Sequence, residues 1–258
     1  MELFTIHTQL IQPKSDLVGM ILEALDKQEL KVSDGDILAI ASKAVTIAQG
    51  RLAKLESVTP SQKAKEIARK YNLDPNFTEV ILREATRVYG GVPKTLLTLK
   101  ENILGPNAGV DRKNAPIGYV ALWPTKPFMT AQKIAKEILA RTGKRVGTLI
   151  VDSRVTPLRM GTTGLALAVA GFEPVRDCRT DKDLYGKSIS ITRHALADDL
   201  ASAAHLIMGE SNEQTPAVLI KNAPVKLADK VKPSSVLISA EQCLFAKHMM
   251  RKAVRELS

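Results

Sequence analysis

Residues 146–171 read VGTLIVDSRVTPLRMGTTGLALAVAG, an apolar run followed by a carboxylate, a polar segment and a run of small residues. The apolar residues 146–151 predict a buried strand that ends at Asp152, with a polar loop after it. A carboxylate at the end of a buried strand can hold a metal ion at the edge of a sheet. The small residues of 161–171 would let the backbone approach a ligand closely, or pack closely against a helix. We therefore expect the floor of an active site in this stretch.

The composition is that of a soluble globular protein, because 45% of the 258 residues are apolar and 25% are charged. No apolar run approaches the length of about 18 residues that a membrane span needs, and the first residues do not have the layout of a signal peptide. The two cysteines, Cys178 and Cys243, have no metal-binding or redox spacing. We expect a cytoplasmic protein with reduced thiols and no membrane partner.

The formal net charge is +10 and the isoelectric point is about 9.6, which favours polyanionic partners. Aromatic residues make up only 4% of the chain, so platforms for stacking bases are scarce. A phosphate-bearing small molecule therefore fits better than a nucleic-acid groove. A basic surface with no specific partner is the alternative interpretation.

The apolar patterns predict helices and strands that alternate with several direct strand-to-strand steps, which is typical of mixed sheets rather than a doubly wound parallel sheet. Thr130 is the expected N-cap of one helix, with Ile138 and Leu139 facing inward and Gly143 as its stop. The expected helices are 16–25, 61–71, 74–88, 130–143, 195–206 and 240–257; the expected strands are 2–11, 37–41, two within 95–110, 118–124, 146–151, 188–191, 217–221 and 236–239. We predict an α+β fold, with mixed β-sheets, flanking helices and no clean boundary between lobes.

Two groups of polar residues could carry chemistry. Ser42 and Lys43 follow the buried strand 37–41, where hydroxyl, amide and ammonium groups can meet phosphate oxygens, although the glycines of a Walker A motif are missing. Asp111, Asp152 and Glu210 are carboxylates in polar segments beside predicted strand or helix ends. Oxygen ligands of this kind suit Mg²⁺ or Mn²⁺, and two such ions could bridge phosphates. Ordinary turn or cap roles for the carboxylates are the alternative.

The four histidines, at positions 7, 194, 205 and 248, are far apart and show no metal-binding spacing. His205 lies just before the segment that carries Glu210, where it could approach a nucleotide or serve as a partly buried structural residue.

Several short motifs in a fixed order resemble the coenzyme F420-0:L-glutamate ligase family. The resemblance covers most of the chain and is strongest between 107 and 220. The motifs are AGVDRKN (108–114), VDS (151–153) with Pro157 and Arg159, AVAGF (168–172), DLYG (183–186), ADDLASAA (197–204) and MGE (208–210).

The resemblance implies an α+β fold in two intertwined lobes and an intertwined homodimer. It implies an enzyme that uses GTP and two divalent ions, Mn²⁺ or Mg²⁺, with K⁺ as a further candidate ion. The expected partners are GTP, L-glutamate and an anionic small-molecule acceptor, with no nucleic acid. The implied reaction phosphorylates a carboxylate of the acceptor, and the glutamate amine then attacks the acyl phosphate to form an amide.

The resemblance also assigns roles to residues of this chain. Asp111 and Asp152 would bind metal, Asp152 the first ion, and Ser153 and Glu210 would border or bind the second. Residues 8–11 would flank the nucleotide. The expected nucleotide-binding residues are Ser42, Lys43, Asn114, Met208, Gly209, Ser211, Asn212, Glu213, Gln214 and Thr215.

The chain departs from the family pattern at Ile47, where a lysine is usual, at Gln49, where a glutamate is usual, and at residues 154–156. Lys43 could replace the lost positive charge. Retained metal ligands beside changed neighbours favour a paralogue with the same ligase chemistry and a different acceptor. A nucleotide-binding protein without ligase activity and a basic RNA-associated protein are the alternatives, and the sequence does not distinguish GTP from ATP.

Overall fold

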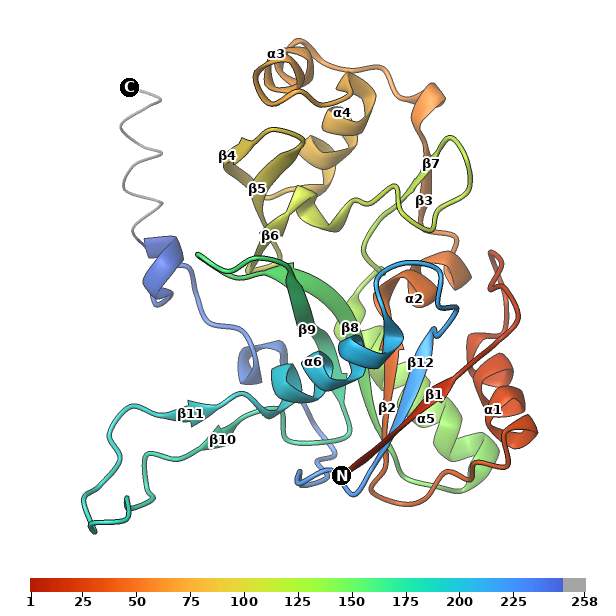
Figure 1. Cartoon of the computed structure of the whole chain (residues 1–258), viewed down its shortest axis with the longest axis vertical. Helices are drawn as coiled ribbons and strands as arrows, with labels where there is room; N and C mark the ends of the chain where they lie inside the picture. Colours follow the sequence, from red (N-terminus) through yellow and green to blue (C-terminus); the bar gives the residue numbers. More distant parts are fainter. Residues whose placement is uncertain (248–258) are drawn as a thin grey trace. The chain divides into compact units, whose positions relative to one another are not determined.

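The computed structural model describes residues 1–247, which form two compact units (Figure 1). No single boundary is visible in the sequence, because each unit is assembled from segments that lie far apart in the chain. The first unit comprises Met1–Gln49, Pro124–Ser153 and Gly161–Val236, and the second comprises Gly50–Trp123, Arg154–Met160 and the described residues from Leu237 to Lys247.

The first unit is built on a mixed five-stranded sheet. Its strands, in spatial order, are β1 (Glu2–Ile6), β12 (Ala217–Lys221), β2 (Ile37–Ala41), β8 (Gly147–Val155) and β9 (Thr162–Ala170). β2 and β8 run parallel, whereas β12 is antiparallel to both β1 and β2. The predicted α+β class with mixed sheets is therefore confirmed.

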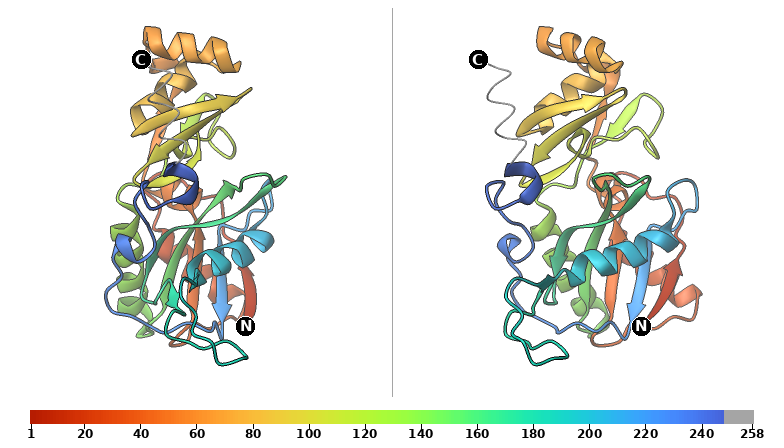
Figure 2. Two further views of the ribbon diagram at one scale, coloured as in Figure 1. Left: turned by 90° about the vertical axis from the view of Figure 1, so that its left-hand side faces the viewer. Right: turned by 60° about the vertical axis from the view of Figure 1, so that its left-hand side comes forward.

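Helix α6 (Leu196–Met208) packs against β9 and covers one face of this sheet, with α5 (Pro127–Thr142) on the other face (Figures 1 and 2). The backbones of α6 and β9 come very close at Gly164, because an added Cβ would lie 2.3 Å from the carbonyl oxygen of Ala201. Asp198 on α6 also accepts a hydrogen bond from the backbone N–H of Ala166, at 2.9 Å. The small residues of 161–171 thus form a strand that packs closely against a helix.

Helix α1 (Leu17–Lys27) packs against α5, and both belong to the first unit. Asp16 is the N-cap of α1 and accepts from the N–H of Gly19 at 3.0 Å. The Arg141 guanidinium of α5 also bonds this carboxylate and, together with Gly19, holds the pKa of Asp16 below its usual value. The cap and the ion pair together join the two helices.

Two details predicted for α5 are wrong. The helix begins at Pro127, which suits the first turn of a helix, and Lys126 rather than Thr130 is its N-cap. Thr130 lies inside the helix and donates its hydroxyl to the carbonyl of Thr125. Leu139, expected to face inward, is 46% exposed, whereas Gly143 ends the helix with a positive φ of 68° as expected.

The second unit contains the helices α3 (Gln62–Tyr71) and α4 (Pro75–Glu84), a three-stranded antiparallel sheet and a two-stranded pair. The sheet has the order β4 (Arg87–Val92), β5 (Thr95–Lys100) and β6 (Ile103–Pro106), and the pair is β3 (Leu52–Lys54) with β7 (Tyr119–Ala121). Short 3₁₀ turns occur at Leu55–Ser57 and Asn107–Gly109, and in the first unit at Pro233–Ser235.

The helix predicted over 74–88 ends early, at Glu84. The backbone N–H of Thr86 bonds to the carbonyl of Leu99, so the chain after the helix pairs with β5 as a strand. Val88, the last residue of the predicted helix, therefore lies in β4. β-branched residues at 86 and 88 suit a strand, but only the pairing partner reveals the switch.

A hairpin arm extends from the first unit between β10 (Arg176–Asp177) and β11 (Arg193–His194) (Figure 1). The strand predicted at 188–191 is absent from this arm, where Ser188 makes a single bridge to Lys182. Residues 236–239, also predicted as a strand, are irregular. The helix predicted over 240–257 lies largely outside the described residues, as does His248. No helix in residues 1–247 is long and apolar enough to cross a bilayer.

Candidate active site

The predicted site residues of the first unit come together because of the strand register. Ala41, the last residue of β2, pairs with Val151 of the parallel strand β8, so Ser42 and Asp152 follow at the same edge of the sheet. β12 runs in the opposite direction and begins at this edge, where the carbonyl of Pro216 accepts from the N–H of Ala41 at 2.9 Å. Three segments distant in sequence therefore meet along one edge.

Ser42 and Lys43 form the first turn of α2 (Ser42–Ala48), directly after β2. Ser42 is buried, with 5% of its surface exposed, and Lys43 is half-buried. Because Ala41 pairs with Val151, Ser42 and Lys43 follow β2 at the level of Asp152 in β8.

Asp152 does not end its strand, contrary to the sequence interpretation. β8 continues to Val155, because its backbone still pairs with β9 after the side chains have left the core. The predicted polar loop over 153–160 is therefore limited to residues 156–161, between the two strands. Asp152 is half-buried, and its Oδ1 accepts from the N–H of Ser153 at 2.9 Å.

The segment after α6 is folded tightly on itself. Gly209 has φ of 76° and ψ of −179°, a conformation that is essentially restricted to glycine. An added Cβ at this residue would lie 2.1 Å from Cδ of Glu213, so glycine also makes room for that side chain. Glu213 accepts from the N–H of Ser211 at 2.7 Å, and hydrogen bonds from its own N–H and from Ser211 lower its pKa.

This loop is also tied to the end of β1. Gln214 donates its side-chain amide to the carbonyl of Thr8 at 3.3 Å. Thr215 is buried, and its hydroxyl lies 3.4 Å from Nδ1 of His7. Residues 8–11 and the loop 208–215, both predicted to flank a nucleotide, are thus neighbours.

Hydrogen bonds from a helix and from a strand hold Glu210. Its Oε1 lies 2.7 Å from Nε2 of His205, on the last turn of α6, and accepts from the hydroxyl of Thr162 at 2.8 Å. Thr162 is the first residue of β9, which is the neighbour of β8 in the sheet. The carboxylate is therefore anchored to both the helix and the sheet.

Asp111 and Asn114 belong to the second unit. Asp111 pairs through its backbone with Ala121, and its Oδ1 accepts from the N–H of Lys113 at 2.8 Å. Asn114 is exposed and has a positive φ of 57°. These two predicted residues lie close in sequence in one polar turn of their own unit.

The predicted metal ligands are all oxygen donors, which is the donor chemistry that Mg²⁺ and Mn²⁺ prefer. Among the described residues, no three histidine, cysteine, aspartate or glutamate side chains gather as a ready-made metal cluster. Asp152, Ser153 and Glu210 offer oxygen donors of the kind that a hard cation binds. Water or phosphate oxygens would have to complete the coordination. Mg²⁺ in particular usually keeps several waters and is bound together with substrate phosphates.

Comparison with known proteins gives a consistent result. The model of the family described as F420-0:Gamma-glutamyl ligase matches residues 5–222 of this chain. The chain belongs to this family.

Its relatives carry the name Coenzyme F420:L-glutamate ligase. The protein from Methanopyrus kandleri is 38% identical over 218 residues, which is 84% of each chain. The protein from Archaeoglobus fulgidus is 34% identical over 216 residues, 84% of this chain and 85% of its own. The protein from Methanocaldococcus jannaschii is 38% identical over 195 residues, 75% of this chain and 78% of its own.

Gln49, where this member departs from the expected family pattern, has a structural role. Its side-chain oxygen accepts from the N–H of Thr125 at 2.8 Å, and its side-chain nitrogen donates to the hydroxyl of Thr130 at 3.0 Å. An amide offers both an acceptor and a donor, whereas an ionised glutamate offers acceptors only. Glutamine here connects the end of α2 to the start of α5. Ile47, the other departure in this helix, is half-buried.

Sequence reasoning missed two side chains that contact the predicted site, His7 and Thr162, and left the role of His205 open between a nucleotide contact and a structural one. His205 carried a partial signal, because it precedes Glu210 by five residues at a helix end. The sequence around His7 and Thr162 gives no indication of their contacts to residues 215 and 210, because these contacts depend on strand pairing and on the packing of α6.

Proposed function

We propose that this protein is a GTP- and divalent-metal-dependent ligase that joins L-glutamate to an acidic acceptor, F420-0 or a related carboxylate, through an acyl phosphate. Family membership supports the ligase class and glutamate as the amino acid. The observation that carries the proposal is the convergence of Ser42–Lys43, Asp152–Ser153 and the loop 208–215 at one edge of the sheet.

The nucleotide would lie along this edge. Ser42 and Lys43 offer a hydroxyl and an ammonium group for phosphate oxygens. The loop 208–215 would enclose the rest of the nucleotide. Gly209 and Glu213 fix the shape of this loop, and a hydrogen bond to Thr8 holds it in place. Backbone groups held in place before binding reduce the ordering cost that the nucleotide would otherwise impose.

Asp152, Ser153 and Glu210 of the first unit would hold divalent ions. Mn²⁺ or Mg²⁺ bound there would neutralise charge on the phosphates and help to align the reacting oxygens.

The proposed reaction has two steps. A carboxylate oxygen of the acceptor takes the γ-phosphoryl group of GTP, which forms an acyl phosphate and releases GDP. The amine of glutamate then attacks the acyl carbon, phosphate leaves, and the amine loses a proton as the amide forms. Both organic substrates and GTP are anionic, which agrees with a formal net charge of +10.

We also propose that the protein is a homodimer in the cytoplasm. The hairpin arm supports dimerisation, because it presents large apolar side chains to solvent: Leu184 is 101% exposed, Tyr185 87% and Ile191 83%. Exposed apolar side chains gathered on one segment are typical of an interaction surface.

The direct test is GDP release. Purified protein with GTP, Mn²⁺ and L-glutamate should form GDP only when an acceptor such as F420-0 is added, and the acceptor mass should rise by one glutamate residue. Asp152→Asn should lower kcat about 100-fold, because the loss of roughly 3 kcal/mol of charge stabilisation corresponds to that factor. Asp26→Asn on the exposed side of α1 is the matched control and should behave as the wild type.

The departures at Ile47 and Gln49 motivate a second candidate, a nucleotide-binding member without ligase turnover. This candidate predicts a rise in melting temperature with GTP but no GDP formation with any acceptor. Absence of both the melting shift and GDP formation would exclude both candidates, and salt-sensitive RNA binding would then favour a basic RNA-associated protein.

A further inference from the structure

We propose that His205 is a positioning residue that, together with Thr162, holds the Glu210 carboxylate ready to bind a divalent ion. This inference rests on the proposed function, because it takes Glu210 to be a metal ligand. It adds two residues that act through Glu210 without contacting the ion themselves.

The first support is the geometry of the histidine. Nε2 of His205 lies 2.7 Å from Oε1 of Glu210, and the His205 side chain is only 15% exposed. An ionised carboxylate can only accept hydrogen bonds, so Nε2 of His205 is assigned as the donor to Glu210. A donor–acceptor pair shielded in this way is stronger than one in open solvent.

The second support is that the two donors come from different elements. His205 lies on the last turn of α6 and Thr162 at the start of β9, and both bond to Oε1. A glutamate side chain has several rotatable bonds, and two donors from a rigid helix and a rigid sheet restrict them before any ion arrives.

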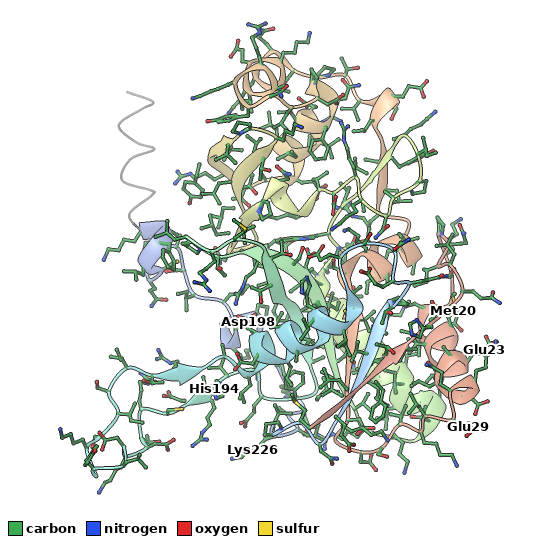
Figure 3. The ribbon with its side chains drawn as sticks, in the orientation of Figure 1. Met20, Glu23, Glu29, His194, Asp198 and Lys226 are labelled. Carbon is green, nitrogen blue, oxygen red and sulfur yellow. The ribbon has the colours of Figure 1, made fainter. Side chains whose placement is uncertain are left out.

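The third support is that α6 itself is fixed on the sheet. Its backbone lies against β9 at Gly164. Asp198, labelled on α6 in Figure 3, accepts from the N–H of Ala166. His205 is therefore positioned by the fold and not by a mobile loop. Hydrogen-bond partners of metal-binding side chains typically change metal affinity by about 10-fold to 100-fold when they are removed.

The chain offers a matched control on the same helix. Nε2 of His194, labelled on β11 in Figure 3, lies 2.6 Å from Oδ2 of Asp199 of α6, which makes an exposed histidine–carboxylate pair. Neither residue of this pair belongs to the proposed site. His194→Ala therefore measures the effect of losing such a pair away from the metal.

The test measures Mn²⁺ affinity in the full-length protein by electron paramagnetic resonance of free Mn²⁺, with GTP present. His205→Ala should weaken Mn²⁺ binding about 10-fold to 100-fold, and activity should recover at high Mn²⁺, so that the apparent KM for the metal changes more than kcat. His205→Gln should restore most of the affinity, because its side-chain amide nitrogen can donate from nearly the same position as Nε2. Thr162→Val, which keeps the shape of the side chain, should weaken binding in the same direction, and His194→Ala should leave it unchanged.

The outcomes separate this inference from the proposed function. If the wild type does not bind Mn²⁺, the proposed metal site and this inference both fail. If Glu210→Gln weakens Mn²⁺ binding but His205→Ala and Thr162→Val leave it unchanged, Glu210 is a ligand that needs no positioning and only the inference fails. If His205→Ala does not fold, the same decision rests on His205→Gln and Thr162→Val: wild-type affinity in Thr162→Val overturns the inference.

Discussion

Replacing Gly164 with alanine should show how strongly the packing of α6 supports the site. The added Cβ would lie 2.3 Å from the carbonyl oxygen of Ala201 and 2.6 Å from the nitrogen of Ser202, both backbone atoms of α6. An ordinary contact needs about 3.4 Å, so the helix must move away from the strand by roughly 1 Å. No side-chain rotation can relieve this clash, because backbone lies on both sides of it.

The expected cost is that of overpacking a core, about 1–3 kcal/mol, and we place Gly164→Ala near 3 kcal/mol because a whole helix must shift. α6 also carries His205 and ends just before Glu210, so the shift should weaken binding of Mn²⁺ and GTP as well.

Urea unfolding followed by circular dichroism measures the stability change, and hydrogen exchange of the amides of β9 and α6 shows whether the loss is local to the first unit. Gly105→Ala is the matched control. Gly105 also lies in a strand, has a negative φ, and would have nothing within 4 Å of its new Cβ. The control should stay within about 0.5 kcal/mol of the wild type. A Gly164→Ala protein that unfolds at the wild-type urea concentration, with unchanged exchange in β9, would refute the reasoning.

Three further predictions follow from single contacts. Gly209→Ala should destabilise the loop after α6 by about 1–3 kcal/mol, because its backbone conformation is restricted to glycine and the new Cβ would meet Glu213. If GTP raised the melting temperature of this variant as much as that of the wild type, the prediction would be contradicted. Hydrogen bonds from Ser61, and then Arg83, lower the pKa of Glu79 from 4.5 to about 2, so its stabilising contribution is complete above pH 4.5 and is lost as the pH falls toward 2. Urea midpoints of Glu79→Gln and wild type should therefore differ at pH 7 and converge near pH 2, and a constant difference would exclude the assignment. Tyr185→Ser should shift the protein from dimer to monomer in light scattering if the arm forms the dimer contact, and an unchanged dimer mass would remove the arm from that role.

The extent to which sequence predicted this protein depends on how local each signal is. The starts of the helices predicted over 16–25 and 61–71 were readable because Asp16 and Ser61 each bond a backbone N–H three residues further along the chain. The central strands 37–41 and 217–221 were predicted with their observed bounds, since fully buried strands read as short apolar runs. The family was readable from ordered motifs spread over most of the chain, and the comparisons confirm it.

Other features depended on partners that are distant in sequence. β8 runs past Asp152 because β9 pairs with it, and α4 gives way to a strand because β5 pairs with residue 86. At Asp152 the local pattern indicated the end of a strand, but the strand continues. After Glu84 it indicated that the helix continues, but the helix ends. Strand pairing decides both cases.

The sequence by itself determined the family, the α+β class and the chemical types of the candidate ligands, because these depend on residue identity and on short-range periodicity. The tertiary structure decided which of those residues meet. The parallel register of β2 and β8 brings Ser42 beside Asp152, and the packing of α6 on β9 brings His205 and Thr162 to Glu210. Strand register and helix packing are set by many weak contacts between distant segments, so no short stretch of sequence contains them.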